Sequence, residues 1–537
     1  MKKVLWTFAV GALVALAACS VKVASGARRA PNADPLILRA HFVGTEQIFA
    51  APESAKLKEL WTLKSSAVLR EEMLTRLAVL PSFWLGENIG LGTPTLTNLF
   101  RPLLEDMLAR ECYFDCTAAP EVLLAVRVSD QRARLWQTNL WQALLNWKLG
   151  KPAAVKIEAG SGFELKHTGL PGVFRCLRAG EWIVVSAGSG SFARETEVLA
   201  NIKSLGRPAR PTGAWLDGDA NLARFDGWLP ALANLKNLPV AHFSVSNRAD
   251  FVRTYATLDF PAPHGWKSEP WQIPTNTIHD PLTSFLAVRG VAPVLESFPA
   301  FRDLGYKPTP SQIIGWGNGS MPFQFNYAAP SRNVLDQLKR MDTKVADAVF
   351  GPERQRFAGQ QIVWDTNLQQ IVWRGLPLAM PQAGVWRDAG REYLAVSCFP
   401  QVQLTNRVPA ALYQALNRND LVVFDFEITE LRVQHWRQLY QLAEISTRQM
   451  PVSTNAPFPS WLGAAAPKLG ESVTELRATS PSQMTLVRKS SLGLTAGEII
   501  TLGRWLESTN FPAFGLFPAQ PLRTAPPPRP APGLPPK

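Results

Sequence analysis

The sequence predicts an α+β fold made of two tandem, internally duplicated modules, each a mainly antiparallel sheet packed with amphipathic helices. Three observations lead to this prediction: strand-like and helix-like patterns alternate along the chain, the same ordered series of elements occurs twice, and a proline-rich segment separates the two series. The chain has 537 residues, of which 46% are hydrophobic and 18% charged. It is therefore long enough for two cores and too apolar to be disordered throughout.

The repeated series is clearest around a Gly-Leu-Pro tripeptide. It occurs at residues 169–171 and again at 375–377, and each copy follows a pair of alternating runs that predicts a β-hairpin, at 155–167 and 361–374. Two unrelated α+β stretches could share single motifs by chance. Because the agreement extends in order over six successive elements, duplication is the favoured interpretation.

The boundary between the copies is predicted where five prolines occur between residues 261 and 281 and no periodicity survives. The last 20 residues contain nine prolines, which predicts an extended polyproline II tail. The predicted organisation is a signal peptide (1–18), a linker (19–32), module copy 1 (33–260), a Pro-rich linker (261–280), module copy 2 (281–508) and the tail (509–537).

Each copy also has segments without a counterpart in the other. Copy 1 has an additional amphipathic helix over 96–108, which Pro102 is expected to kink or split. Copy 2 has a Pro/Ala-rich insert over 450–470 and a closing helix, whose first turn is predicted to carry a capping box formed by Thr495 and Glu498.

The N-terminus has the pattern of an export signal. Lys2 and Lys3 precede an apolar run over 4–16 that is too short for a comfortable membrane span. The segment ends in Leu-Ala-Ala-Cys at 16–19, which resembles the lipobox of bacterial lipoproteins. The resemblance implies cleavage before Cys19 and diacylation of its thiol; the alternatives are an ordinary cleaved signal or a retained anchor.

Lipidation would hold the protein at a membrane surface. Ser20 follows the cysteine, and the resemblance then implies the outer membrane, with the protein facing the periplasm or the surface. The layout of residues 33–508 resembles that of uncharacterised bacterial envelope proteins with tandem α+β modules. That resemblance carries over no functional residue and implies no known activity.

The charge excludes some classes of function. The net charge is +13, from 56 basic and 43 acidic residues, but it is scattered and includes no run of five basic residues. Nucleic acid is therefore not expected as a partner. After residue 18 no uncharged apolar run reaches about 18 residues, which excludes a polytopic membrane protein.

Four cysteines remain besides Cys19. Cys112 and Cys116 form the only close pair, and an exported protein can form disulfides, so a local disulfide between them is the favoured interpretation. The alternatives are two free thiols or part of a metal site. A metal site would need further Cys or His ligands, and no His lies within 40 residues of the pair. No metal is expected.

The sequence contains no phosphate-binding loop, zinc-protease motif or nucleophile elbow, so no catalytic residue and no cofactor are expected. Acidic pairs are the only candidates for chemistry: Asp217 with Asp219 in copy 1, and Asp425 with Glu427 in copy 2. A spacing of two puts both carboxylates on one face of a strand, where they could serve as acid and base in sugar hydrolysis or bind calcium. The favoured interpretation is that they cap the following helices and stay solvated.

These observations predict a lipid-anchored cell-envelope protein with a non-enzymatic binding or scaffolding role. Its expected partners are the membrane, through the lipid, and either another envelope protein or a polysaccharide. The alternative is an envelope polysaccharide or peptidoglycan hydrolase that uses the paired carboxylates. The two hypotheses differ in one geometric respect, because the hydrolase needs the four carboxylates within about 5 to 10 Å of each other.

Overall fold

The structure is a computed structural model of the chain, and it describes residues 36–81, 94–118, 121–166, 172–188, 192–225, 237–248, 251–318, 325–350, 360–375, 380–399, 409–447, 456–508 and 511. The predicted signal peptide, Cys19 and the tail beyond residue 511 lie outside these residues. The two Gly-Leu-Pro tripeptides also lie outside them, apart from Gly375.

The described residues include twenty strands that belong to one sheet. The ten strands of the first half are β1 (Leu36–Phe42), β2 (Cys112–Thr117), β3 (Glu121–Arg127), β4 (Ala153–Ile157), β5 (Gly160–Lys166), β6 (Val173–Ala179), β7 (Trp182–Gly188), β8 (Leu216–Asn221), β9 (Val240–Arg248) and β10 (Phe251–Asp259). Those of the second half are β11 (Leu282–Arg289), β12 (Gln312–Asn318), β13 (Phe325–Pro330), β14 (Gln361–Asp365), β15 (Gln370–Arg374), β16 (Gln382–Asp388), β17 (Arg391–Ser397), β18 (Leu421–Ile428), β19 (Glu471–Ser480) and β20 (Gln483–Ser490).

Helices occupy the connections between strands. Those of the first half are α2 (Thr45–Ala50), the 3₁₀ helix η1 (Pro52–Ser54), α3 (Ala55–Thr62), α4 (Lys64–Leu77), α6 (Pro94–Ala109), α7 (Asp130–Asn146), α8 (Ala193–Leu205) and η2 (Leu222–Arg224). Those of the second half are α10 (Ala292–Ser297), α11 (Pro299–Leu304), α12 (Val334–Phe350), α13 (Ala410–Leu416), α14 (Thr429–Thr447), α15 (Pro457–Ala465), η4 (Ala466–Lys468) and α16 (Ala496–Glu507). None of the described helices is long and apolar enough to span a bilayer.

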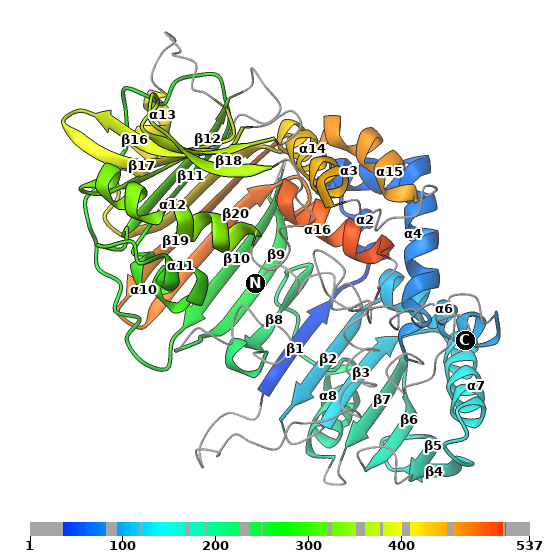
Figure 1. Cartoon of the computed structure of the whole chain (residues 1–537). Coiled ribbons are helices and arrows are strands. Elements are labelled where there is room, and N and C mark those ends of the chain that lie inside the picture. The colour runs from blue at the N-terminus through cyan, green and yellow to red at the C-terminus, as the bar shows by residue number, and fades with distance from the viewer. Residues whose placement is uncertain are drawn as a thin grey trace, which may run out of the picture.

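All strand pairings are antiparallel, and they run in the order β4-β5-β6-β7-β3-β2-β1-β8-β9-β10-β20-β19-β18-β11-β12-β13-β17-β16-β15-β14. The sheet therefore continues from one half of the chain to the other through β10 and β20, which lie side by side near its middle (Figure 1). The prediction of an α+β fold with mainly antiparallel sheet is confirmed.

The pairing order of the first half recurs in the second. β1 pairs with β2 and β8, and β11 pairs with β12 and β18. β3 pairs with β7 as β13 pairs with β17. Residues 260–281, which connect the halves, form neither helix nor strand. Because β10 and β20 pair over eight residues, this proline-rich segment does not separate two independent sheets.

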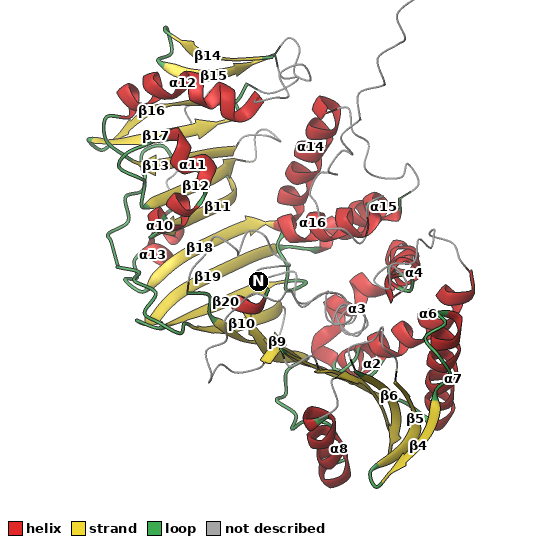
Figure 2. Ribbon diagram, turned by 60° about the horizontal axis from the view of Figure 1, so that its bottom comes forward, coloured by secondary structure: helices red, strands yellow, loops and turns green. Residues whose placement is uncertain are grey.

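The helices lie on both sides of the sheet. We call the side that carries α4, α6, α7, α12, α14 and α16 face A, and the side that carries α8 and α13 face B. Figure 2 shows α8 across the sheet from α3, α4 and α6. Strand β3 is buried on both faces, which explains its nearly continuous apolar sequence. Its even-numbered residues pack in the core of face A and its odd-numbered ones beneath α8.

The largest core lies on face A and joins segments from the two ends of the chain. Trp136 of α7, Phe100 of α6 and Leu103 of α6 are at most 2% exposed, and they belong to the same cluster as Phe458 of α15 and Ile500 of α16. Full burial of a large apolar side chain contributes about 1.5 to 3 kcal/mol. The N-terminal helices and the C-terminal helices therefore stabilise one another.

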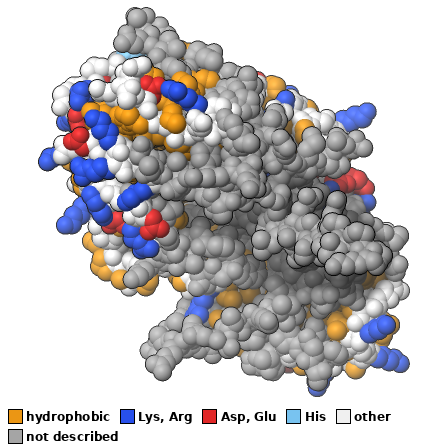
Figure 3. Space-filling model, viewed as in Figure 1, with side chains coloured by type: hydrophobic (Ala, Val, Ile, Leu, Met, Phe, Trp, Pro, Cys, Tyr) orange, Lys and Arg blue, Asp and Glu red, His pale blue; other side chains and the backbone are white. Residues whose placement is uncertain are grey.

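Several local predictions can be compared directly with these elements. The hairpins predicted at 155–167 and 361–374 are present as β4–β5 and β14–β15. The capping box of Thr495 and Glu498 is present at the start of α16. The helix predicted over 96–108 is present as α6, which continues through Pro102 and is therefore not split there. On the side shown in Figure 3, Lys and Arg side chains lie among Asp and Glu over the second half of the chain.

Candidate functional site

The first predicted acidic pair lies within the sheet. Asp217 and Asp219 of β8 point to face B, where Asp217 Oδ2 is 3.5 Å from Nδ1 of His41. The Oδ1 atom of Asp219 lies 2.7 Å from Nδ1 of His242 on β9. The prediction that this pair caps the next helix is wrong, because both carboxylates face neighbouring strands. Asn221 caps η2 instead.

The second pair, Asp425 and Glu427 of β18, lies on face A, where Glu427 is buried and Asp425 is half-buried. Glu427 Oε1 accepts a hydrogen bond of 2.7 Å from the backbone N–H of Ala496, the first residue of α16. Glu427 is thus a helix cap, but for a helix 69 residues away and not for the next one. Burial raises the pKa of Glu427 to about 7 and that of Asp425 to about 6.

The four carboxylates do not form one site. Between β8 and β18 the sheet has five strand-to-strand steps, and five steps of about 4.8 Å make about 24 Å. The pairs also lie on opposite faces. Directly paired residues share a face, and the pairings that start from Asp425 and Thr474 lead across the sheet to Leu216, whose neighbour Asp217 points the other way. The arrangement expected for a hydrolase with converging carboxylates is therefore absent from these four residues.

The predicted disulfide between Cys112 and Cys116 is wrong. Both residues lie on β2, and four strand positions of about 3.3 Å separate their Cα atoms by about 13 Å. A disulfide needs Cα atoms within about 7 Å. The Cys112 thiol instead donates to the carbonyl of Met107 at 3.1 Å, and burial raises its pKa far above the ordinary value. It is therefore a buried, unreactive thiol.

His41 forms a buried charged cluster that the sequence did not reveal. Its side chain lies between two carboxylates, with Nε2 3.0 Å from Glu111 Oε1 and Nδ1 3.5 Å from Asp217 Oδ2. Burial alone would lower the pKa of His41. The hydrogen bonds and charges of Asp217 and Glu111 outweigh this effect and raise the pKa to about 9. The imidazole is therefore protonated at neutral pH and links β1 to its neighbours.

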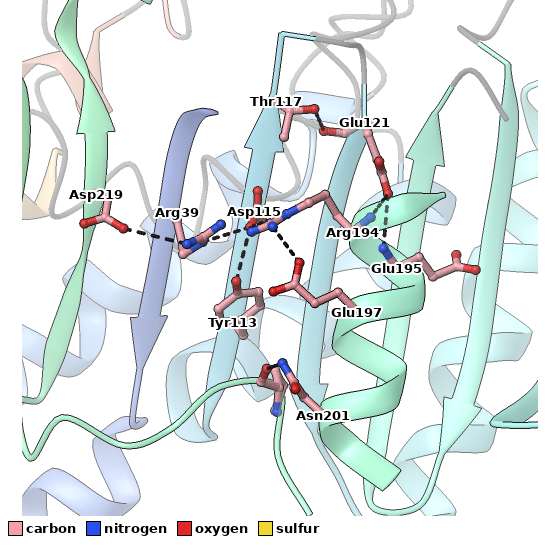
Figure 4. Close-up of polar contacts among 11 residues, drawn as sticks. Arg39, Tyr113, Asp115, Thr117, Glu121, Arg194, Glu195, Glu197, Asn201 and Asp219 are labelled. Carbon is pink, nitrogen blue, oxygen red and sulfur yellow. Dashed lines mark hydrogen bonds and ion pairs between the residues drawn. The ribbon is translucent and has the colours of Figure 1, made fainter. Parts of the chain in front are cut away.

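A second ionic cluster on face B links β1, β2 and α8 (Figure 4). Asp115 is 1% exposed and accepts hydrogen bonds from Arg39 at 3.0 Å, from Arg194 at 2.5 Å and from the Tyr113 hydroxyl at 3.1 Å. Glu121 of β3 accepts from the first backbone N–H groups of α8 at 3.0 and 3.1 Å. Like Glu427, it caps a helix that is distant in sequence, and the cluster has the character of a structural network.

An apolar cavity of about 360 Å³ lies on face A. Its floor is the sheet, and its walls are the helices between β1 and β2, helix α15 before β19 and helix α16 after β20. Three of these helices, α6, α15 and α16, fall in the segments for which the sequence shows no counterpart in the other half. The strand residues of the floor are Ala40, Phe42, Cys112, Phe114, Leu124, Leu216, Val245 and Val252, and the wall residues include Ile48, Leu60, Leu69, Met73, Leu77, Phe458, Leu502 and Leu506.

The walls are held together by polar contacts between the two ends of the chain. Trp461 of α15 donates from Nε1 to the Ser66 hydroxyl of α4 at 2.8 Å. Arg76 of α4 donates to the carbonyl of Ser508 at 3.3 Å. The half-exposed members of the lining come mainly from α2, α3 and α4, which indicates that the cavity opens to solvent on that side.

The cavity has the size and character of a small-molecule site. Such sites measure about 300 to 1,000 Å³ and are lined mainly by apolar and aromatic side chains with a few polar groups. Arg70 is the only charged residue in the described lining. No three His, Cys, Asp or Glu residues of the described ranges lie so that they could hold a metal ion. The arrangement can therefore hold a hydrocarbon, and it offers no evident acid, base or nucleophile.

Comparison with known proteins adds no functional assignment. No protein-family model, no curated protein and no solved structure matches the chain.

Proposed function

We propose that the protein is an exported, lipid-anchored cell-envelope protein with a non-enzymatic binding role, and that its ligand is an apolar molecule held in the face A cavity. The observation that carries this proposal is the apolar cavity of about 360 Å³, whose half-exposed lining residues come mainly from α2, α3 and α4. An engineered cavity of about 150 Å³ lined by Leu, Ile and Phe stays dry and binds benzene. Binding of a hydrocarbon in a larger cavity of the same character is stabilised by about 0.8 kcal/mol for each methylene group that leaves water.

The binding test uses a neutral apolar fluorophore such as N-phenyl-1-naphthylamine with the purified full chain. We expect saturable fluorescence enhancement at a ratio of one per chain. Leu74→Trp places a bulky ring in the half-exposed lining and should reduce binding at least tenfold. Leu99→Trp is the matched control, because Leu99 is also half-exposed and packs on the same core but does not line the cavity. Equal binding by the two variants would refute the assignment of the site.

The anchoring proposal is supported by the signal-like N-terminus and the Leu-Ala-Ala-Cys pattern that ends at Cys19. It is tested by expressing the chain in bacteria with labelled palmitate and following the label in the purified protein. We expect incorporation into the wild type and none into Cys19→Ser. Incorporation that persists in Cys19→Ser, or is missing from the wild type, would count against a lipid at this residue.

The hydrolase alternative needs four carboxylates in one pocket. The observation that weighs against it is that Asp217 and Asp219 lie about 24 Å of sheet away from Asp425 and Glu427, on the other face. Each pair also has a structural role: Asp217 of the first pair contacts His41, and Glu427 of the second caps the N-terminus of α16. We therefore propose binding in preference to hydrolysis.

We also infer that the two halves, 33–260 and 281–508, are copies of one module. The recurrence of the same pairing order in β1–β10 and β11–β20 supports duplication more directly than the shared tripeptides do. The test is an alignment of homologous sequences, in which the profile of each half should match the other with β1 on β11 and β10 on β20. An alignment that shifts the halves by one or more strands would contradict the inference.

A further inference from the structure

One charged side chain, that of Arg70, lies in the otherwise uncharged lining of the cavity. Arg70 lies on α4 and lines a cavity whose other described lining residues are uncharged. Its guanidinium carbon is 4.5 Å from the ring centroid of Trp61, and its Nη1 donates only a long hydrogen bond of 3.4 Å to the Trp61 carbonyl. A guanidinium group has five N–H donors. These two contacts therefore leave most of the donors of the half-buried Arg70 side chain without a hydrogen-bond acceptor in the described part of the chain.

The acidic residues near Arg70 are engaged elsewhere. The four acidic residues of α2, α3 and α4 each form an ion pair with a different cation: Glu46 with Arg110, Glu59 with Lys468, Glu71 with Arg101 and Glu72 with Arg76. Within the described ranges no carboxylate lies within ion-pair distance of Arg70. Burial lowers the pKa of Arg70, and the charge of Glu71, which already pairs with Arg101, offsets this effect only in part.

The cavity volume limits the size of the occupant. If about 150 Å³ accommodates the six carbons of benzene, about 360 Å³ accommodates roughly 14 carbons. This volume suits one hydrocarbon chain and is too small for a phospholipid with two chains. An anionic head at the opening would complete the arrangement, because a guanidinium binds a carboxylate through two parallel hydrogen bonds.

We infer that the ligand is a single-chain anionic amphiphile, a carboxylate with about 12 to 14 carbons, whose chain fills the cavity and whose head group is bound by Arg70. This inference rests on the proposed function, since it identifies the class of ligand for the same site. The chain supplies the affinity through burial, and Arg70 supplies the preference for an anion. Ser66 does not share this role, because its hydroxyl is already bonded to Leu60 and Trp461.

The experiment compares three ligands that have the same chain and different head groups. Dodecanoate, 1-dodecanol and dodecylammonium are used below their micelle-forming concentrations to displace the neutral fluorophore from the full chain. For the wild type we expect dodecanoate to displace it at a concentration 10- to 100-fold lower than 1-dodecanol, which is the range for a hydrogen-bonded charge pair. Dodecylammonium should be the weakest of the three.

Arg70→Met should abolish the preference for dodecanoate and leave 1-dodecanol within about twofold of the wild type. Arg70→Lys should retain part of the preference, because it keeps the charge and loses the planar fork. Lys64→Met is the matched control: it removes one positive charge from an exposed position on the same helix and should leave the preference unchanged. Circular dichroism establishes that each variant is folded, and the wild-type series tests the charge preference even if Arg70→Met fails to fold.

The outcomes separate the two proposals. If the wild type binds neither the fluorophore nor any dodecyl ligand, the proposed function fails. If the fluorophore and 1-dodecanol bind but dodecanoate has no advantage, or Arg70→Met keeps that advantage, the inference about Arg70 is overturned and the binding function stands.

Discussion

The indole N–H of Trp461 donates a hydrogen bond of 2.8 Å to the hydroxyl of Ser66, and this bond joins residues 395 positions apart in the chain. Ser66 is buried and also donates to the Leu60 carbonyl at 2.6 Å. Both residues line the apolar cavity. The contact therefore fixes the C-terminal helices against the N-terminal ones at the cavity wall.

Loss of this contact should destabilise the protein. Ser66→Ala leaves the Trp461 N–H and the Leu60 carbonyl without their partner, which costs about 1 to 3 kcal/mol. The measurement is the free energy of unfolding in urea for Ser66→Ala, Trp461→Phe and the double variant. A double-mutant cycle should give a coupling of about 0.5 to 1.5 kcal/mol. Strict additivity would show that the bond contributes nothing to stability.

His41 should make stability depend on alkaline pH. Its pKa is raised from 6.5 to about 9 in the folded protein, so its stabilising contribution is complete below pH 6.5 and is lost as the pH rises through 9. A shift of this size corresponds to about 3 kcal/mol. We expect His41→Gln to lower the free energy of unfolding at pH 6 and to have a much smaller effect at pH 9.5. A difference between wild type and variant that stays constant over this range would contradict the charged state of His41.

Glu427 should produce a loss of stability between acid and neutral pH. Burial raises its pKa from 4.5 to about 7, so the folded protein favours the protonated form and loses stability as the pH rises through 7. Glu427→Gln keeps an oxygen that can accept from the N–H of Ala496 and removes the charge. It should unfold at higher urea concentration than the wild type at pH 8 and at a similar concentration at pH 5.

Glu475 of β19 is the control for Glu427, because its pKa is shifted in the opposite direction. Burial would raise its pKa, but the hydrogen bonds from Arg418 and Arg477 outweigh that effect and lower the pKa. Glu475→Gln should therefore destabilise the protein at pH 8, and this loss should diminish as the pH falls below 4.5. If the two variants respond to pH in the same direction, the burial argument for Glu427 does not hold.

Asp115 should be a sensitive position of the cluster on face B. Asp115→Ala removes the carboxylate that Arg39 and Arg194 share, and because Asp115 itself is buried the loss should exceed the roughly 1 kcal/mol that an exposed ion pair contributes at most. Glu181 pairs with Arg127 at 2.7 Å on the surface, and Glu181→Ala should cost less than about 1 kcal/mol. The thermal midpoints of the two variants check this ranking.

The sequence correctly predicted the features that depend on residues close together along the chain. Period-two alternation predicted the hairpins at 155–167 and 361–374, and the spacing of Thr495 and Glu498 predicted the capping box. The reason for glycine at 162 is visible only in the folded sheet. Gly162 lies in β5, where a Cβ would lie within 3 Å of the backbone of Cys176 on β6.

Residue spacing determined that the two carboxylates of each acidic pair share a face, because side chains alternate along a strand. It could not determine which face, because a shift of one residue in register reverses every side chain, and β18 has an irregularity between Leu421 and Val423. Tertiary structure alone placed Asp217 against His41 and Glu427 at the start of α16. It alone also brought helices from the two ends of the chain together around the cavity beside Arg70, since the contacts that do so join positions hundreds of residues apart and leave no local pattern in the sequence.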